Sequence, residues 1–192
     1  MHRFIRRENI KHYQNLLEYE TDPARRQSIM NLLAEEVAKD LDDNQLDEIL
    51  AMAMAELGAS MGNIQLLDRN RRTLFIAAQR GFKQDFLDYF RVVSAGDKCA
   101  CGFALREQKR IVIEDVETDD SFTSMRSIAR AAGFRAVQST PLTGRDNKPM
   151  GMLSTHFSSK HRPSEHDLKR LAWHIDRAVD SFTEQSANVA AI

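Results

Sequence analysis

The chain has 192 residues, with 27 lysines and arginines against 28 aspartates and glutamates. That length is enough for one domain with a hydrophobic core and a short extension, and the balanced charge does not favour nucleic acid or an anionic membrane as partner. The basic start lacks the apolar stretch of a signal peptide, and no segment approaches the roughly 20 apolar residues of a membrane span. With only two cysteines, Cys99 and Cys101, we expect a cytoplasmic protein with reduced thiols.

Residues 1–42 have the spacing of a helical hairpin. Two stripes of apolar residues indicate it: Ile10, Tyr13 and Leu17, then Ile29, Leu33 and Val37. Between the stripes, Thr21-Asp22-Pro23 is typical of the start of a new helix. Both stripes are narrow, so we expect the hairpin to pack on the following domain or on a second copy. The acidic residues 40–44 are expected to end its second helix.

Residues 43–185 show a different pattern, in which helices and short strands follow one another. The spacing predicts helices at 46–57, 83–90, 101–108, 121–132 and from 164 onward, and strands at 61–67, 73–78, 110–116, 135–142 and 149–157. Polar turns at 68–71 and 144–148 have the length of hairpin connections. This order predicts an α+β fold, with an antiparallel sheet and helices on its faces.

The last helix carries an apolar seam suited to packing against another helix, from the same or a second chain. Its positions alternate by three and four: Leu168, Leu171, Ile175, Ala178 and Phe182. Residues 186–192 are expected to form a flexible tail.

Five segments carry a resemblance to a known family. They are MGNIQLLD (61–68), CGFALREQKRIVIEDVETDDSF (101–122), GFRAVQSTPL (133–142), GMLSTHF (151–157) and HRPSEHDLKRL (161–171). In this order they resemble the GAF domain, in particular the kind found in bacterial sensory proteins such as histidine kinases. The resemblance covers about residues 45–183. It implies a six-stranded antiparallel sheet, dimer-forming helices on one face, and a small-molecule pocket on the other.

The resemblance names no ligand, because GAF domains bind cyclic nucleotides, tetrapyrroles, haem, amino acids and metals. We therefore predict the pocket from strand alternation, which brings polar side chains to one sheet face. The predicted strand residues are Asn63, Gln65, Gln138, Thr140, Ser154 and His156. A few such groups among apolar neighbours suit a pocket for a polar ligand. The alternative is that these side chains face water or bond to one another.

Arg135 precedes a strand and is a candidate for binding an anionic ligand through its forked donors. The favoured interpretation is that it pairs with a carboxylate, Asp115 or Asp119. His156, His161, Glu165 and His166 are of metal-binding types, but their spacing does not make them converge, so no metal site is predicted.

Cys99 and Cys101 have three interpretations. The favoured one is packing, because free cysteines are among the most buried residues. The second is a redox pair: Cys101, as in related GAF domains, begins a short helix whose dipole, with Lys98, would lower its pKa, and Cys99 would resolve it. A bridge over one intervening residue would be strained. The third is attachment of a ligand or metal, and on these grounds Cys101 is also a candidate site residue.

We expect a GAF domain that binds a small molecule and signals through its terminal helices in a homodimer, or to a separate signalling protein such as a histidine kinase. No catalytic residue and no particular cofactor is predicted. The alternatives are a ligand-free interaction module, a cysteine redox switch, or an enzyme like the free methionine-(R)-sulfoxide reductases. Those enzymes are similar around Cys101 but use a second cysteine after the next strand, where residues 117–125 have none.

Overall fold

The computed structural model describes residues 2–68, 72–144, 148–172, 175–176 and 179. The chain divides into two compact units, residues 1–45 and residues 46–192. Some sequence expectations lie outside the described residues: the centres of both hairpin turns, the seam positions Ala178 and Phe182, and the tail 186–192.

The first unit holds a pair of helices, as the sequence predicts. α1 (His2–Tyr19) is followed after a short turn by α2 (Pro23–Leu57), which continues into the second unit. The Asp22 carboxylate accepts the backbone N–H of Arg25 at 2.9 Å and so caps the start of α2. Proline at the first helical position loses nothing, because its missing N–H would have no partner there.

The predicted interruption of the second helix at residues 40–44 is wrong. α2 is continuous and includes the helix that was expected separately at 46–57. Asp and Asn inside a helix cost at most about 0.7 kcal/mol each, whereas Gly and Pro cost about 1 and 3 kcal/mol. After Pro23 the helix contains neither Gly nor Pro, so the acidic residues do not end it.

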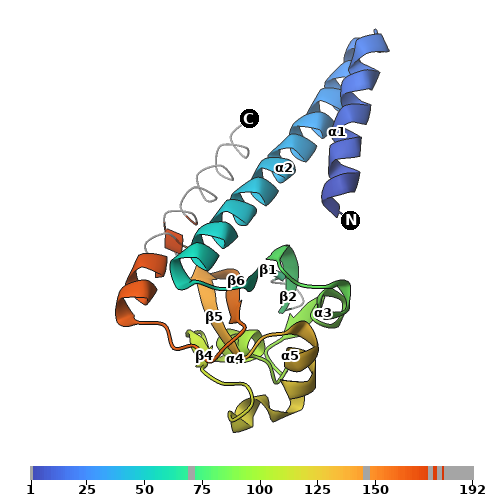
Figure 1. The fold of residues 1–192 in the computed structure, drawn as a ribbon. Helices are drawn as coiled ribbons and strands as arrows, with labels where there is room; N and C mark the ends of the chain where they lie inside the picture. Colours follow the sequence, from blue (N-terminus) through green and yellow to red (C-terminus); the bar gives the residue numbers. More distant parts are fainter. Residues whose placement is uncertain (1, 69–71, 145–147, 173–174, 177–178, 180–192) are drawn as a thin grey trace. The chain divides into compact units, whose positions relative to one another are not determined.

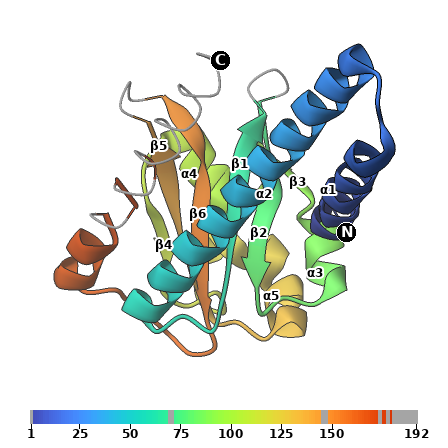
Figure 2. The ribbon, with the colours of Figure 1, turned by 90° about the horizontal axis from the view of Figure 1, so that it is seen from above.

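The second unit contains one antiparallel sheet of six strands in the order β3-β2-β1-β6-β5-β4 (Figure 1 and Figure 2). The strands are β1 (Met61–Asp68), β2 (Thr73–Arg80), β3 (Val92–Ser94), β4 (Ile111–Ile113), β5 (Ala136–Thr143) and β6 (Pro149–Phe157). β1 pairs with β2 and β5 with β6, and the pairing of β1 with β6 joins these two hairpins. The centre of the sheet therefore consists of β1, β6 and β5.

Helices cover both faces of this sheet (Figure 2). Residues 46–57 of α2 and the C-terminal helical residues share an apolar cluster with Ile64, Leu153 and Phe157; two seam positions, Leu171 and Ile175, belong to it. The other face is covered by α3 (Gln84–Tyr89), α4 (Ala100–Glu107), the 3-10 helix η1 (Asp120–Met125) and α5 (Arg126–Ala132). We call the two sides the helix face and the cavity face.

The short elements depart most from the sequence expectation. β3 has three residues and was not predicted, and β4 also has three where a strand over 110–116 was expected. The helix expected at 121–132 begins as η1, whose first turn is capped by the Asp119 carboxylate accepting the N–H of Ser121 at 2.9 Å. These elements all border the cavity face or the β4 edge.

Candidate functional site

Polar side chains from three adjacent strands gather on the cavity face. Residues directly opposite each other in antiparallel strands project to the same side of a sheet. Asn63 of β1 and Ser139 of β5 both lie opposite Ser154 of β6, one on each side. Gln65 and His156, two positions along their strands, share this face. The hydroxyls of Ser139 and Ser154 are hydrogen-bonded, 2.7 Å apart.

These side chains line an enclosed space that we call the sheet cavity. Its lining residues are Asn63, Gln65, Phe86, Phe90, Cys99, Ala100, Cys101, Phe122, Phe134, Val137, Ser139, Ser154 and His156. The four phenylalanines fill most of the room, and the remaining volume is about 20 Å³. One water needs about 10–15 Å³. The sheet cavity as it stands has space for a water-sized group.

Several polar atoms in the sheet cavity have no hydrogen-bond partner among the described residues. They are Oδ1 of Asn63, Oε1 and Nε2 of Gln65, and Nδ1 of His156. All three side chains are buried. Buried polar atoms in folded proteins are nearly always paired with protein or water, and an unpaired one costs about 1–3 kcal/mol. Four such atoms in the wall of one cavity indicate an occupant that forms hydrogen bonds.

His156 is a neutral group in this wall. The rings of Phe82 and Phe134 contact it edge-on, with centroids 4.8 and 4.6 Å from the imidazole centroid. Burial lowers the pKa of His156 to about 3. A neutral imidazole has one donor and one acceptor nitrogen. Since no Asp, Glu, Lys or Arg is among the described residues of this lining, hydrogen bonding rather than charge distinguishes this site.

The two thiols form part of the wall. Cys99 is buried at the N-cap of α4, Cys101 is partly exposed, and their Sγ atoms are 3.3 Å apart. The Cys101 thiol lowers the pKa of Cys99, with help from the backbone amides of Gly102 and Cys101 and against the effect of burial. The Cys99 thiol and burial raise the pKa of Cys101. The redox interpretation expected the lowered pKa at Cys101; the structure instead places Cys99 at the helix cap, and the pKa of Cys101 is raised.

Five of the eight predicted site residues line the sheet cavity: Asn63, Gln65, Cys101, Ser154 and His156. The prediction that Gln138 and Thr140 share their face is wrong. The β5–β6 register places Ser139 opposite Ser154, so the neighbours of Ser139 project to the helix face. There the Gln138 amide donates to the Thr140 hydroxyl at 3.3 Å, and Arg110 Nε donates to the same hydroxyl at 3.1 Å.

The sequence did not identify Ser139, Cys99 or the phenylalanines as lining residues. Ser139 alternates with Gln138 in β5, so the correct register would have revealed it. The phenylalanines come from α3, η1 and the segment before β5. No local pattern indicates that such residues meet over the sheet.

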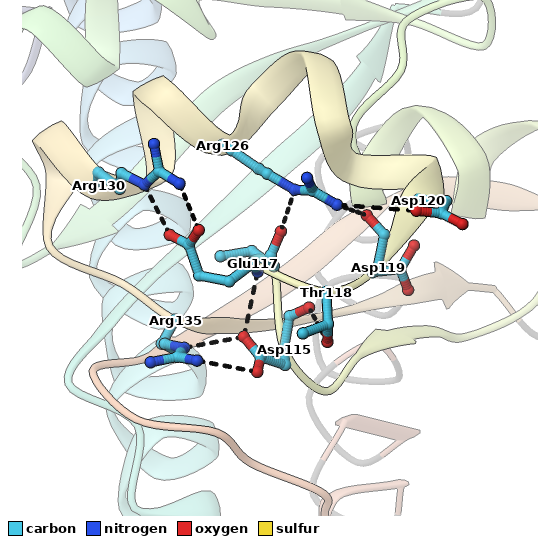
Figure 3. Close-up of polar contacts among 9 residues, drawn as sticks. Asp115, Glu117, Thr118, Asp119, Asp120, Arg126, Arg130 and Arg135 are labelled. Atoms are coloured by element: carbon cyan, nitrogen blue, oxygen red, sulfur yellow. Dashed lines mark hydrogen bonds and ion pairs between the residues drawn. The ribbon is translucent and has the colours of Figure 1, made fainter.

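Arg135 lies outside the sheet cavity and forms two hydrogen bonds with the buried Asp115 carboxylate, from Nε at 2.8 Å and from the terminal nitrogen at 3.0 Å. The favoured sequence interpretation of Arg135 is thus confirmed. Figure 3 shows this pair and two further arginines that hold the same loop. Arg130 pairs with Glu117 through both carboxylate oxygens, and Arg126 donates to the Val116 carbonyl at 3.0 Å.

Above this loop is an open, charged depression that we call the β4 cleft. It has a volume of about 480 Å³ and is lined by Val112, Glu114, Asp115, Thr118, Asp119, Lys160, His161 and Arg162. Lys160 pairs with Asp115 at 2.9 Å, and Arg162 with Glu114 at 3.3 Å. Arg135 and then Lys160 hold the pKa of Asp115 well below its usual range. Two ion pairs therefore occupy the β4 cleft, the Asp119 carboxylate accepts hydrogen bonds from Ser121, and Nε2 of His161 is buried without a partner among the described residues.

Two features are absent from the described part of the chain. No three His, Cys, Asp or Glu side chains lie close enough together there to bind a metal ion. No helix among the described residues has both the length and the apolar character that crossing a bilayer requires.

The family model of the GAF domain matches residues 40–173, which include the whole sheet, the sheet cavity and the β4 cleft. The chain belongs to the GAF domain family. No curated protein matches it. The match begins inside α2, so the first 39 residues lie outside this GAF domain.

Solved structures share this fold at low identity. A domain assigned to a two-component sensor histidine kinase of Sinorhizobium meliloti 1021 is 16% identical, with a TM-score of 0.63 over 76% of this chain and 93% of that one. The type II free methionine-R-sulfoxide reductase of Thermoplasma acidophilum is 16% identical, with a TM-score of 0.60 over 74% and 93%. The GAF domain of an Acinetobacter phosphoenolpyruvate-protein phosphotransferase is 13% identical, with a TM-score of 0.61 over 98% of both chains. At such identities the likeness establishes the fold alone.

Proposed function

We propose that this GAF protein is a non-enzymatic sensory or regulatory module whose sheet cavity binds a small, neutral, polar molecule. The observation that carries the proposal is the set of unpaired polar atoms on Asn63, Gln65 and His156. The lining offers hydrogen-bond donors, acceptors and aromatic rings but no charged side chain. A phosphate or carboxylate would lack a cation to pair with, so a neutral molecule that both donates and accepts hydrogen bonds fits best.

A ligand larger than water must displace part of the roof over the strands. Phe86 and Phe90 lie on or beside α3, and Phe122 is on η1, two helices of six residues each. Short elements of this kind open at lower free energy than a central sheet. We therefore expect binding to reorder residues 92–101 and 121–132, which connect to these helices.

β6 offers a direct route from the sheet cavity to the terminal helices. Ser154 and His156 line the cavity, while Leu153 and Phe157 pack with α2 and the C-terminal helical residues. A strand that shifts to accommodate a ligand moves both sets of side chains, because they alternate along one backbone. The expected recipient of this signal is a second copy, or a separate protein such as a histidine kinase, the class to which one structural neighbour is assigned.

The size of the sheet cavity supports a second candidate function, a ligand-free interaction module. A volume of about 20 Å³ leaves room for a buried water, and waters could satisfy some of the unpaired atoms. In that case no metabolite would stabilise the protein. For the enzymatic alternative, the likeness to a sulfoxide reductase extends to the fold, and residues 117–125 contain no cysteine to act as the second thiol.

The first test is to purify the protein natively, denature it, and identify released small molecules by mass spectrometry. If none is released, a panel of nucleobases, amides and polyols is screened for compounds that raise Tm. The proposal predicts a neutral ligand by one of these routes, and protection of residues 92–101 and 121–132 from hydrogen exchange when it binds. Failure of both routes would favour the interaction module.

Two glutamines on opposite faces of the sheet provide matched variants. Gln65 and Gln138 are both buried, and each has a side-chain oxygen without a partner. Gln65→Met should weaken ligand binding about tenfold or more, the effect of one lost hydrogen bond, while Gln138→Met leaves it unchanged. Equal losses in both variants would show that the ligand does not contact the cavity face.

A further inference from the structure

Two thiols lie side by side where α4 begins. Cys99 and Cys101 are both free, and their sulfurs are 3.3 Å apart. The S–S bond of a disulfide is about 2.05 Å long. The two sulfurs must therefore approach by about 1.2 Å to form a covalent bond, and the short loop between them must adapt to the bridge.

The backbone around the pair fixes this spacing. A Cβ on Gly102 would lie 2.4 Å from the carbonyl oxygen of Asp97, so only glycine fits where α4 meets the preceding turn. The Asp97 carboxylate accepts the backbone N–H of Ser94 at 2.6 Å and its hydroxyl at 3.1 Å. The turn of residues 94–97 thus sets where the helix starts, and with it the approach of Cys99 to Cys101.

The two thiols are not equivalent. The Cys101 thiol and the backbone amides at the start of α4 lower the pKa of Cys99, and the pKa of Cys101 is raised by Cys99 and by burial. The thiolate is the nucleophilic form of cysteine. Cys99 occupies the N-cap of α4, where the helix dipole favours a thiolate, so Cys99 is the attacking group and Cys101 is the thiol that completes a bridge.

We propose that Cys99 and Cys101 form a dithiol modification site, which a small hydroperoxide oxidises to an intramolecular disulfide. The Cys99 thiolate attacks a peroxide oxygen: an S–O bond forms, the O–O bond breaks, and the departing oxygen takes the proton released by Cys99. The Cys101 sulfur then attacks the sulfenic acid on Cys99: an S–S bond forms, and the hydroxyl leaves with the Cys101 proton as water. Two thiols lose two electrons and two protons, and an organic hydroperoxide is reduced to an alcohol and water, or hydrogen peroxide to two waters.

Access limits the oxidant to small molecules. Both cysteines line the sheet cavity, whose volume is about 20 Å³, and Cys101 is also partly exposed. Hydrogen peroxide is only slightly larger than water, for which this volume is sufficient. Oxidation of the two thiols requires no ligand in the sheet cavity.

The test treats the reduced full-length protein with one equivalent of hydrogen peroxide, alkylates the remaining thiols and digests with trypsin. Cleavage after Lys98 and Arg106 releases one peptide, residues 99–106, that carries both cysteines. The expected peptide is not alkylated and is lighter by two hydrogen atoms than the reduced, unalkylated form. The denatured chain should form this product at least about tenfold more slowly, because it lacks the local environment that activates Cys99.

Two variants separate the roles of the thiols. Cys101→Ser should leave a sulfenic acid on Cys99 that dimedone traps, and Cys99→Ser should slow peroxide consumption at least about tenfold. The measurement on the wild-type protein tests the proposal even if neither variant folds. Alkylation of both cysteines after peroxide treatment, bridges only between chains, or equal rates in the folded and denatured protein would each overturn the proposal.

Discussion

The sheet cavity and the β4 cleft contrast in every property that bears on ligand binding. The sheet cavity is enclosed, about 20 Å³ in volume and lined by neutral residues, with polar atoms on Asn63, Gln65 and His156 unpaired. The β4 cleft is open and about 480 Å³ in volume; its ion pairs centre on Asp115, and Nε2 of His161 is buried without a partner among the described residues. Most polar groups of the larger space are thus paired, whereas four polar atoms in the wall of the smaller one have no partner among the described residues.

This contrast explains why size alone is a poor guide to the site. A large, well-formed apolar pocket with a few polar groups is the usual first candidate for a binding site. The β4 cleft is large but charged, and a ligand there would have to displace existing ion pairs. The sheet cavity needs only a rearranged roof, and its unpaired atoms favour an occupant. The predictions below test each side of this contrast.

The largest effect is expected from Phe134→Ala, which empties part of the sheet cavity. Phe134 is buried, and its ring contacts those of Phe86 and His156. Removing a buried phenylalanine side chain typically costs 3–5 kcal/mol, so we expect a loss of about 3–5 kcal/mol in the free energy of unfolding, measured in urea. Phe75→Ala, at a side chain 43% exposed, is the control and should cost less than about 1 kcal/mol. Equal losses would mean that the phenylalanines do not form a packed roof.

A smaller effect is expected from protonation of His156. Burial lowers its pKa in the folded protein from 6.5 to about 3. Below pH 6.5 the unfolded chain therefore binds a proton that the folded chain does not, and stability falls toward pH 3 by about 1.4 kcal/mol per pH unit. At pH 5 the expected loss relative to pH 7 is about 2 kcal/mol.

His156→Phe isolates this contribution. The pKa of His161 is also lowered by burial, so the wild type should be compared with the variant, in which His161 is retained. The difference in stability between the two proteins should change between pH 6.5 and 4 and stay constant above pH 7. Parallel curves over the whole range would show that the pKa of His156 is the same in the folded protein as in the unfolded chain, and hence that the sheet cavity is wetter than its lining indicates.

The sequence was sufficient to predict the main sheet and the helices that show strong periodicity. β1, β2, β5 and β6 have enough residues for alternation to be visible. Five segments in the order typical of the GAF family resembled that family, which the family model also matches. β3 was missed because a strand of three residues is too short to show an alternation of apolar and polar residues. The interruption at residues 40–44 was wrong because acidic residues disfavour a helix only weakly.

The site was harder to predict than the fold. Alternation shows which residues of one strand share a face, but the register between strands decides which of those faces coincide. That is why Asn63, Gln65, Ser154 and His156 were grouped correctly, and Gln138 was placed with them wrongly. The roof depends on contacts between residues distant in the chain, for which one sequence contains no signal.

The smallest of these effects is expected at the β4 cleft, from Asp115→Asn. Asparagine keeps an oxygen that can accept the Glu117 N–H, and the partner side chains Arg135 and Lys160 are 42% and 66% exposed, so water can solvate them when the charge is removed. Because the pKa of Asp115 is lowered, its charge stabilises the fold above about pH 4, and that contribution is lost as the pH falls further. The Tm of the variant should be lower than that of the wild type at pH 7, and this difference in Tm should be smaller at pH 3.

Lys160→Met is the control for this prediction, since the Arg135 pair with Asp115 remains and Tm should change less than in Asp115→Asn. Both variants should leave ligand binding in the sheet cavity unchanged, because neither residue belongs to its lining. An equal difference in Tm between Asp115→Asn and the wild type at pH 3 and pH 7 would show that Asp115 acts through its shape rather than its charge. Loss of ligand binding in either variant would instead connect the β4 cleft to the sheet cavity, and the contrast between a paired and an unpaired site would no longer decide which of them binds.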